Sequence, residues 1–180
     1  NGTLAAASTH TNREIHTSGF RGFGIVENTG LDYDFNYAKQ WGNDGSLIQD
    51  AYAYNLEGGY TAKYSWKPRL SATLAFASGD KDSKDSRNQR FDSLFGASRS
   101  SLSASNSIQF SNLYATKIRG HLTPLDKLKV DFGYSWYHLA SATDLWSGGA
   151  NLQDKAGKSG KNIGEEFDIR VRYSINQYIG

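Results

Sequence analysis

The fold of this chain is decided by the stretch YAYNLEGGYTAKYSW, residues 52–66. Its two sets of alternate positions differ in character: one is mainly apolar and aromatic, and the other is small or polar. The first set comprises Tyr52, Tyr54, Leu56, Gly58, Tyr60, Ala62, Tyr64 and Trp66, and the second includes Ala53, Asn55, Glu57, Thr61 and Lys63. Because successive side chains of a β-strand point to opposite faces of a sheet, the stretch predicts a strand with one apolar and one polar face.

The same alternation recurs on both sides of this stretch. It is clear at residues 31–40, 69–76, 128–136 and 166–175, rougher at 108–122, and least regular at 18–28. The chain is therefore predicted to be all-β, with about seven antiparallel strands. The residues that we expect on the apolar faces, in contact with lipid, include Tyr33, Phe35, Tyr54, Leu56, Leu74, Phe132, Val171 and Tyr173.

The composition agrees with amphipathic strands and excludes several other classes of protein. Hydrophobic residues make up only 38% of the 180 residues, whereas aromatic residues reach 13%. The net charge of +2 provides no basic field for nucleic acid, and the absence of cysteine excludes disulfides and thiolate sites. No apolar run of about 18 residues occurs, which excludes a transmembrane helix. Asn1 does not begin a signal peptide, so we expect a processed chain or a segment of a longer protein.

The connections between the predicted strands alternate in length. Short turns are expected near residues 29–30, 65–68, 122–126 and 175–178, and longer links at 42–47, 79–106 and 141–162. Outer-membrane barrels combine short periplasmic turns, longer outer loops and aromatic girdles, so the pattern favours an antiparallel transmembrane β-barrel segment over residues 1–180. In that interpretation, residues 1–15 end an outer loop, and 79–106 and 141–162 are long outer loops. The alternative is a soluble sandwich or lipocalin-type barrel, which has no reason to alternate its loop lengths.

Four motifs carry a resemblance to a known family. They are GLDYD at residues 30–34, PRL at 68–70 followed by ASGDKD at 77–82, FDSLF at 91–95, and IGEEFDI at 163–169. In this order and spacing they resemble the alginate export family of outer-membrane β-barrel proteins, over nearly the whole chain from about His16 onward. The succession of a strand, a Ser-Gly-Asp loop and Phe-Asp-x-Leu-Phe is the most specific part of the resemblance.

The resemblance implies that the chain is the carboxyl-terminal portion of a larger barrel of about 16–18 strands, which would leave an aqueous channel. A piece of seven strands has two unpaired edges, and its end, Tyr178-Ile179-Gly180, lacks the terminal aromatic residue expected of a finished outer-membrane strand. Either the seventh strand is the last one and its end is atypical, or a final hairpin is missing. The resemblance also implies a protein of the bacterial outer membrane that passes an anionic polysaccharide such as alginate. Its expected partners are that polysaccharide, outer-membrane lipid and periplasmic export components, with no cofactor and no enzymatic activity.

The polar faces supply candidate residues for binding a polyanion in the lumen. Rings of Arg or Lys are the means by which anion pores select their ions. Carboxylates share the same faces, at Asp32, Asp34, Glu57, Asp131, Glu166 and Asp168, so ion pairs that only stiffen the wall are the plainer explanation. The candidate cations are Lys63, Arg69, Lys117, Arg119, Lys129, Arg170 and Arg172.

Two other kinds of site have some support in the sequence. Asp80, Asp82 and Asp85 are spaced as oxygen ligands for Ca²⁺ could be, but interleaved lysines favour a solvated outer loop, and we expect no metal. A triad of His138, Ser141 and Asp144 would require a hydrolase at the barrel rim, without any supporting motif. Besides the channel and this hydrolase, a structural or surface-binding barrel with a plugged lumen and partner-contacting loops stays open as a third function.

Overall fold

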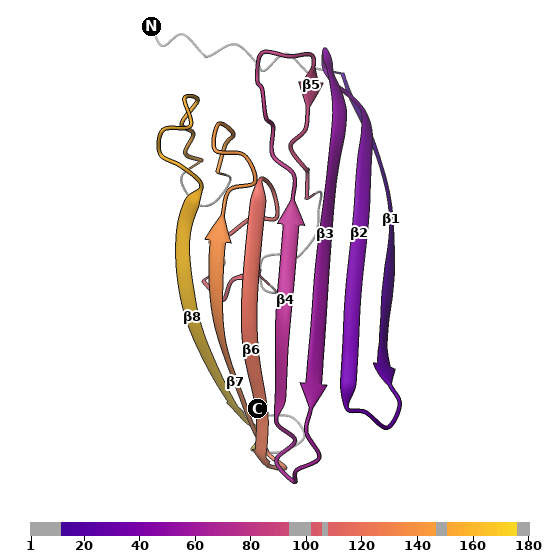
Figure 1. Ribbon diagram of the computed structural model, residues 1–180, viewed down its shortest axis with the longest axis vertical. Coiled ribbons are helices and arrows are strands. Elements are labelled where there is room, and N and C mark those ends of the chain that lie inside the picture. Colours follow the sequence, from indigo (N-terminus) through magenta and orange to yellow (C-terminus); the bar gives the residue numbers. More distant parts are fainter. Residues whose placement is uncertain (1–11, 94–101, 106–107, 147–150, 176–180) are drawn as a thin grey trace, which may run out of the picture.

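Seven long strands follow one another in chain order across a single antiparallel sheet, with the order β1-β2-β3-β4-β6-β7-β8. The computed structural model describes residues 12–93, 102–105, 108–146 and 151–175 (Figure 1). The predicted all-β fold with about seven antiparallel strands is confirmed. An additional two-residue strand, β5 (Arg87–Asn88), pairs in parallel with β3. The long strands are β1 (Arg13–Val26), β2 (Leu31–Asp44), β3 (Leu47–Thr61), β4 (Arg69–Ala77), β6 (Leu113–Leu125), β7 (Leu128–His138) and β8 (Asn162–Tyr173).

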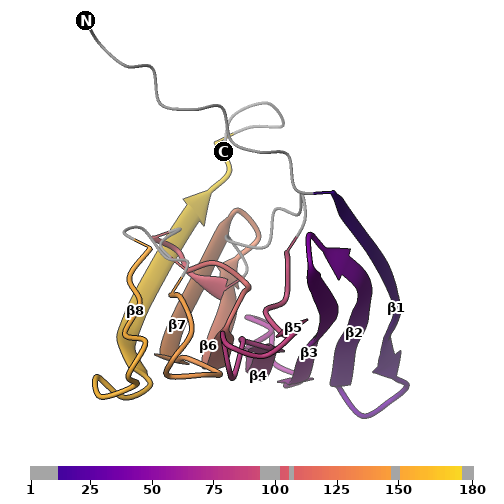
Figure 2. The same ribbon diagram turned by 90° about the horizontal axis from the view of Figure 1, so that it is seen from above.

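The sheet is the curved wall of a barrel segment and does not close on itself. Seen along the strands, it forms an arc with β1 and β8 at its two edges (Figure 2). The long connections β4–β6 and β7–β8 lie at one end of the sheet, and the turns β1–β2, β3–β4 and β6–β7 lie at the other (Figure 1). No helix among the described residues is long and apolar enough to cross a membrane.

Two boundaries differ from the sequence prediction. The link expected to be longer at residues 42–47 is a tight turn at residues 45–46, because Gly45 takes a positive φ of 66° and lets β2 continue to Asp44. Strand β1 begins at Arg13, so residues 13–15, expected in an outer loop, already pair with β2. The turn predicted at 175–178 lies outside the described residues beyond position 175.

The convex face of the sheet is apolar and aromatic. One continuous row of ring-bearing side chains runs across five strands in register, from Phe20 through Tyr37, Tyr54 and Phe76 to Tyr114. Two neighbouring pairs of rings are in contact, with 5.7 Å between the ring centroids of Phe20 and Tyr37 and 5.3 Å between those of Tyr54 and Phe76. All eight residues expected on the apolar faces share this convex face through the strand register, as predicted.

On the convex face, aromatic rings cover glycines of the neighbouring strand. The ring of Phe132 lies over Gly120, its cross-strand partner, and would meet an added Cβ at 2.2 Å. Phe35 lies over Gly22 in the same way, with 2.4 Å to the added Cβ. The rings therefore cover backbone that would otherwise lack a side chain, a device that stabilises glycine in sheets.

We expect the same substitution to destabilise the barrel on one face and to be nearly neutral on the other. Ile118 is 49% exposed at the middle of the convex face, whereas Ile25 is 78% exposed on the other face of the sheet, opposite Asp32. An Ile118→Arg change should destabilise the lipid-embedded barrel by roughly 2–4 kcal/mol, because a guanidinium would face hydrocarbon. Ile25→Arg should be nearly neutral. Urea unfolding of the closed barrel in lipid vesicles measures both; equal losses would contradict a lipid-facing convex side.

Candidate functional site

The side chains of the concave face form layers, because the antiparallel register is continuous across the strands. Toward the end with the long connections lies an alanine layer, made of Ala38, Ala51, Ala53, Ala75, Ala77 and Ala115. A charged layer follows toward the short turns. Its members are Asp32, Asp34, Glu57, Arg69, Lys117, Arg119, His121, Asp131, Glu166, Asp168, Arg170 and Arg172.

The β4–β6 connection folds into the concave side and packs on the alanine layer. Its described parts, residues 89–93, 102–105 and 108–112, are called the inward loop here; they lie within the arc of the sheet (Figure 2). Phe91 and Ile108 of this loop are only 6% and 4% exposed and cluster with Leu113 and the layer's alanines. Because alanine side chains are small, they leave the space that the inward loop occupies. Alanines at the polar-face positions of several predicted strands were therefore the signal in the sequence for a loop packed there.

Two buried glutamines fasten the inward loop to β2 and β3. Gln40 donates from Nε2 to the carbonyl of Asp92 at 2.8 Å and accepts from the Asp92 amide at 2.9 Å. Gln49 donates from Nε2 to the Arg90 carbonyl at 2.9 Å. Both glutamine side chains are almost fully buried, and these bonds satisfy the Gln40 amide and Nε2 of Gln49. Oε1 of Gln49 has no hydrogen-bond partner among the described residues. Sequence reasoning missed both residues.

The far end of the inward loop is held by β7 and β8. Glu166 accepts three hydrogen bonds, from the Ser103 and Ser105 hydroxyls and the Ala104 amide, each at 2.7 Å. Tyr137 donates its hydroxyl to the Leu102 carbonyl at 2.7 Å. Glu166 was predicted as a wall carboxylate; its carboxylate instead anchors the loop, which thereby spans the concave side from β2 to β8.

A second junction joins the two long connections. Asp144, in the β7–β8 connection, pairs with Arg90 and accepts a hydrogen bond from the Asp80 amide at 2.7 Å. The hydrogen bond to Asp144 raises the pKa of Arg90, and burial raises the pKa of the Asp80 carboxyl. Asn112 bridges the same connections, donating to the Ser141 carbonyl at 3.1 Å. These contacts hold the mouth of the concave side as one unit.

Asp144 and Ser141 of the suggested triad make their hydrogen bonds within this junction. Asp144 is committed to Arg90, and the Ser141 hydroxyl bonds Thr143 at 3.0 Å. Among the described residues, no hydrogen bond joins His138 to Ser141 or Asp144, and the buried Nδ1 of His138 has no partner. The geometry therefore does not assemble a nucleophile, base and acid.

The three aspartates considered for Ca²⁺ stabilise separate turns. Asp80, Asp82 and Asp85 each accept a backbone amide, from Gln89, Lys84 and Arg87 respectively. No cluster of three or more metal-binding side chains occurs in the part of the chain that the structure describes. The carboxylates thus point to different backbone segments.

In the charged layer, Arg69 joins two carboxylates. Its guanidinium bonds both oxygens of Asp32, at 2.9 and 2.5 Å, and Oε1 of Glu57 at 2.7 Å. The guanidinium lies over Gly59, where an added Cβ would come within 2.4 Å of Nη2. Arg21, which sequence reasoning did not single out, pairs with Asp34 in the same bidentate manner. Such pairs fix planar geometry as well as charge.

The most buried ion pair of the layer joins Lys117 to Asp168. Nζ of Lys117 lies 2.8 Å from Oδ2 of Asp168, and the two side chains are only 7% and 10% exposed. Gly133 makes room for them, because an added Cβ would meet the Lys117 side chain at 2.7 Å and Asp168 Oδ2 at 2.8 Å. Next to this pair, Asp131 bonds both His121 and Arg172 at 2.8 Å.

The predicted lumen cations therefore separate into two groups. Arg69, Lys117 and Arg172 are paired with carboxylates. For Lys63, Arg119, Lys129 and Arg170 there is no ion pair within the described ranges; Lys63 lies past the end of β3 and bonds the Asn28 carbonyl at 3.4 Å. The Nε of Arg119 and the hydroxyl of Ser71, its cross-strand partner, are both buried and have no hydrogen-bond partner in the described part of the chain. This second group can still attract an anion.

We expect removal of one member of the buried pair to cost far more than removal of both. Asp168→Asn would leave the Lys117 ammonium buried without its carboxylate, which costs roughly 3–5 kcal/mol of unfolding free energy. Adding Lys117→Met should recover most of that loss. Urea unfolding of the barrel in vesicles gives both values. A loss for Asp168→Asn within about 0.5 kcal/mol, as for ordinary surface changes, would mean that water reaches the pair freely.

We also expect Gln40→Leu to release the inward loop. The change keeps the size of the side chain but removes its two bonds to the Asp92 amide and carbonyl, which are partly buried. Each of these bonds contributes roughly 0.5–1.5 kcal/mol. Amide hydrogen exchange of residues 89–93 should accelerate. Asn43→Leu, on the opposite face of the same strand, serves as control and should leave that exchange unchanged. Equal exchange in both variants would show that the glutamine does not hold the loop.

Comparison of the sequence with known proteins identifies the family of the chain. The sequence matches the alginate export family over residues 1–180. A search among curated proteins finds no matching sequence. The match extends over the two structural features described above, the curved antiparallel sheet and its inward loop, and it confirms the resemblance drawn from four short motifs. The chain therefore belongs to the alginate export family.

Proposed function

We propose that this chain forms part of the wall of an outer-membrane channel that passes an anionic polysaccharide such as alginate. Membership of a transport family supports passage of a polysaccharide and not an enzymatic role. The apolar convex face suits contact with outer-membrane lipid, and the rings of Tyr54 and Phe76, 5.3 Å apart, suit an aromatic girdle. Residues 79–106 and 141–162 would then belong to connections at the outer mouth.

This proposal rests on one observation: some cations of the concave face are paired with carboxylates and others are not. Arg119, Lys129 and Arg170 lie there without ion pairs among the described residues, next to cations that are fully paired. Unpaired cations attract uronate carboxylates, while the paired residues keep the wall rigid and nearly neutral. Conduction requires binding that is favourable enough for entry and weak enough for release, which a few scattered cations provide.

A filled barrel is the second candidate, and the inward loop favours it. The loop occupies the concave side near the long connections and is held by Gln40, Gln49 and Glu166. A structural or surface-binding barrel would use such a loop as a plug. In a channel the same loop would narrow the passage on this side and leave the charged layer open below it. Conductance decides between them, because a plugged barrel passes no steady current.

We expect neutralisation of the unpaired cations to reduce anion preference without altering the wall. The variant carrying Arg119→Gln, Lys129→Gln and Arg170→Gln removes three positive charges, so its reversal potential in a salt gradient should move toward cation selectivity. The control, Arg172→Gln with Asp131→Asn, removes one charge of each sign and should leave selectivity unchanged. Both are measured with the closed barrel in planar bilayers, with and without added polyuronate. A wild-type barrel without conductance would contradict the channel.

A further inference from the structure

We infer that a pocket between the inward loop and strands β1–β3 binds a single pyranose ring of the transported polymer. The pocket has a volume of about 440 Å³, within the range of small-molecule sites. Its polar lining is Arg21, Asn36 and Asn55, from three successive strands, and its loop side is Phe91, Ser93 and Phe110. This inference rests on the proposed function, because passage of a polysaccharide would bring sugar rings to this face.

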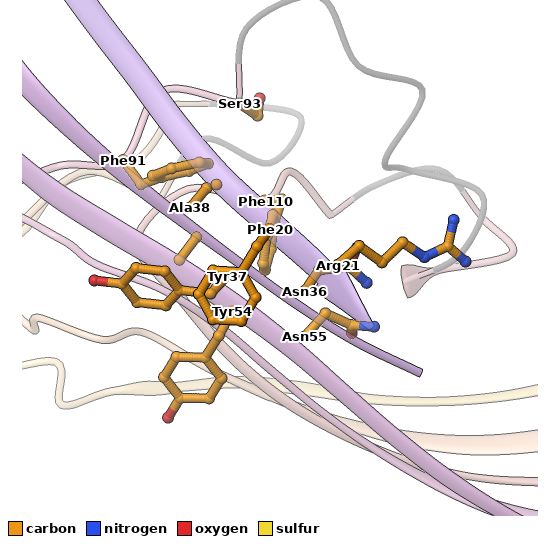
Figure 3. Close-up of a pocket in the computed structure, with 12 residues that line it drawn as sticks. Phe20, Arg21, Asn36, Tyr37, Ala38, Tyr54, Asn55, Phe91, Ser93 and Phe110 are labelled. Atoms are coloured by element: carbon orange, nitrogen blue, oxygen red, sulfur yellow. The ribbon is translucent and has the colours of Figure 1, made fainter. Parts of the chain in front are cut away.

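Strand register explains why polar groups gather here. Arg21 is the cross-strand partner of Asn36, and Asn36 is the partner of Asn55. Side chains paired in this way stand on one face about 5 Å apart, so the three residues can reach different hydroxyls of one sugar ring. Figure 3 shows the three side chains together on one side of the strands, away from the rings of Tyr37 and Tyr54.

The pocket exists because the next row of the sheet carries almost no side chain. Gly19, Ala38 and Ala53 are in register there, directly beside the polar row. The inward loop packs above these small residues, and Phe91 lies beside Ala38 (Figure 3). A space is therefore left between the long polar side chains and the loop.

Several hydrogen-bonding groups in the pocket have no partner among the residues that the structure describes. Arg21 bonds Asp34 through Nε and Nη2, at 2.9 and 2.5 Å, which leaves Nη1. Asn36 donates one bond, from Nδ2 to Asp34 at 3.2 Å, which leaves its carbonyl oxygen. The side-chain amide of Asn55, which lines the pocket, makes no hydrogen bond within the described part of the chain. The pocket thus offers donors and acceptors together, as ring hydroxyls require.

Phe110, which is partly exposed, supplies the apolar surface for the ring, and the buried Phe91 supports it from behind. Phe91 and Phe110 meet edge to face, with 6.0 Å between their centroids and 66° between their planes. A pyranose has a face of C–H groups and a rim of hydroxyls, so an aromatic wall opposite two amides fits both parts. Because Asp34 neutralises Arg21, recognition depends on hydroxyls and ring shape more than on net charge. The unused Nη1 of Arg21 would accommodate a uronate carboxylate.

The test measures saccharide binding separately from conductance. Isothermal titration of the full-length barrel in detergent, with alginate hexasaccharide as probe, should give a Kd about tenfold higher for Asn55→Leu, equivalent to about 1.4 kcal/mol. Phe110→Leu removes the aromatic wall and should weaken binding similarly. Thr123→Val, on the same face but outside the pocket, should bind as the wild type does.

Each outcome bears on one of the two proposals. Unchanged affinity in both Asn55→Leu and Phe110→Leu would overturn the pocket, even if the wild-type barrel conducts and prefers anions. Weaker binding in both, in a barrel that passes no current, would support the pocket and contradict the channel. Folding of each variant is checked by its heat-modifiable migration on a gel; if Asn55→Leu does not fold, Asn36→Leu replaces it with the same expectation.

Discussion

Continuous antiparallel register is the constraint on which both faces of this sheet depend. Because side chains alternate with a period of two, a slip of one residue would carry the cations to the convex face and the aromatic rings to the concave one. The register is unbroken through β1, β2, β3, β4 and into β6, and irregularities occur only at the ends of the β6–β7 and β7–β8 pairs. The layers of alanine, amide and charge all follow from this alignment.

Small residues on the concave face have two distinct uses. In the alanine layer they leave space for the inward loop, whose buried Phe91 and Ile108 would otherwise clash with longer side chains. In the charged layer Gly59 and Gly133 lie beneath ion pairs that need the room of a missing Cβ. The loop fills part of the concave side and the ion pairs stiffen the sheet, so missing side-chain volume shapes the site as much as charged groups do.

The ion pairs on the concave face determine which of its cations can still attract an anion. A wall with every cation exposed would bind a polyanion along its whole length and release it slowly. Here Arg69 and Lys117 are neutralised by carboxylates, while Arg119 retains an unsatisfied Nε beside the unsatisfied hydroxyl of Ser71. Above this layer, Asn36 and Asn55 offer amides instead of charge. The face therefore combines attraction for carboxylates with groups suited to hydroxyls.

The sequence by itself determined the strands, their two faces and the family, because a period of two is a local property that segments such as 52–66 carry in full. It did not determine the path of the β4–β6 connection, since the bonds of Gln40 and Glu166 to it join residues 52 and 63 positions apart. Nor could it tell paired from unpaired cations: Lys117 and Asp168 are 51 positions apart and meet only through the registers of β6, β7 and β8. Tertiary structure decided these points, because long-range contacts depend on which strands become neighbours and not on the local pattern of any one strand.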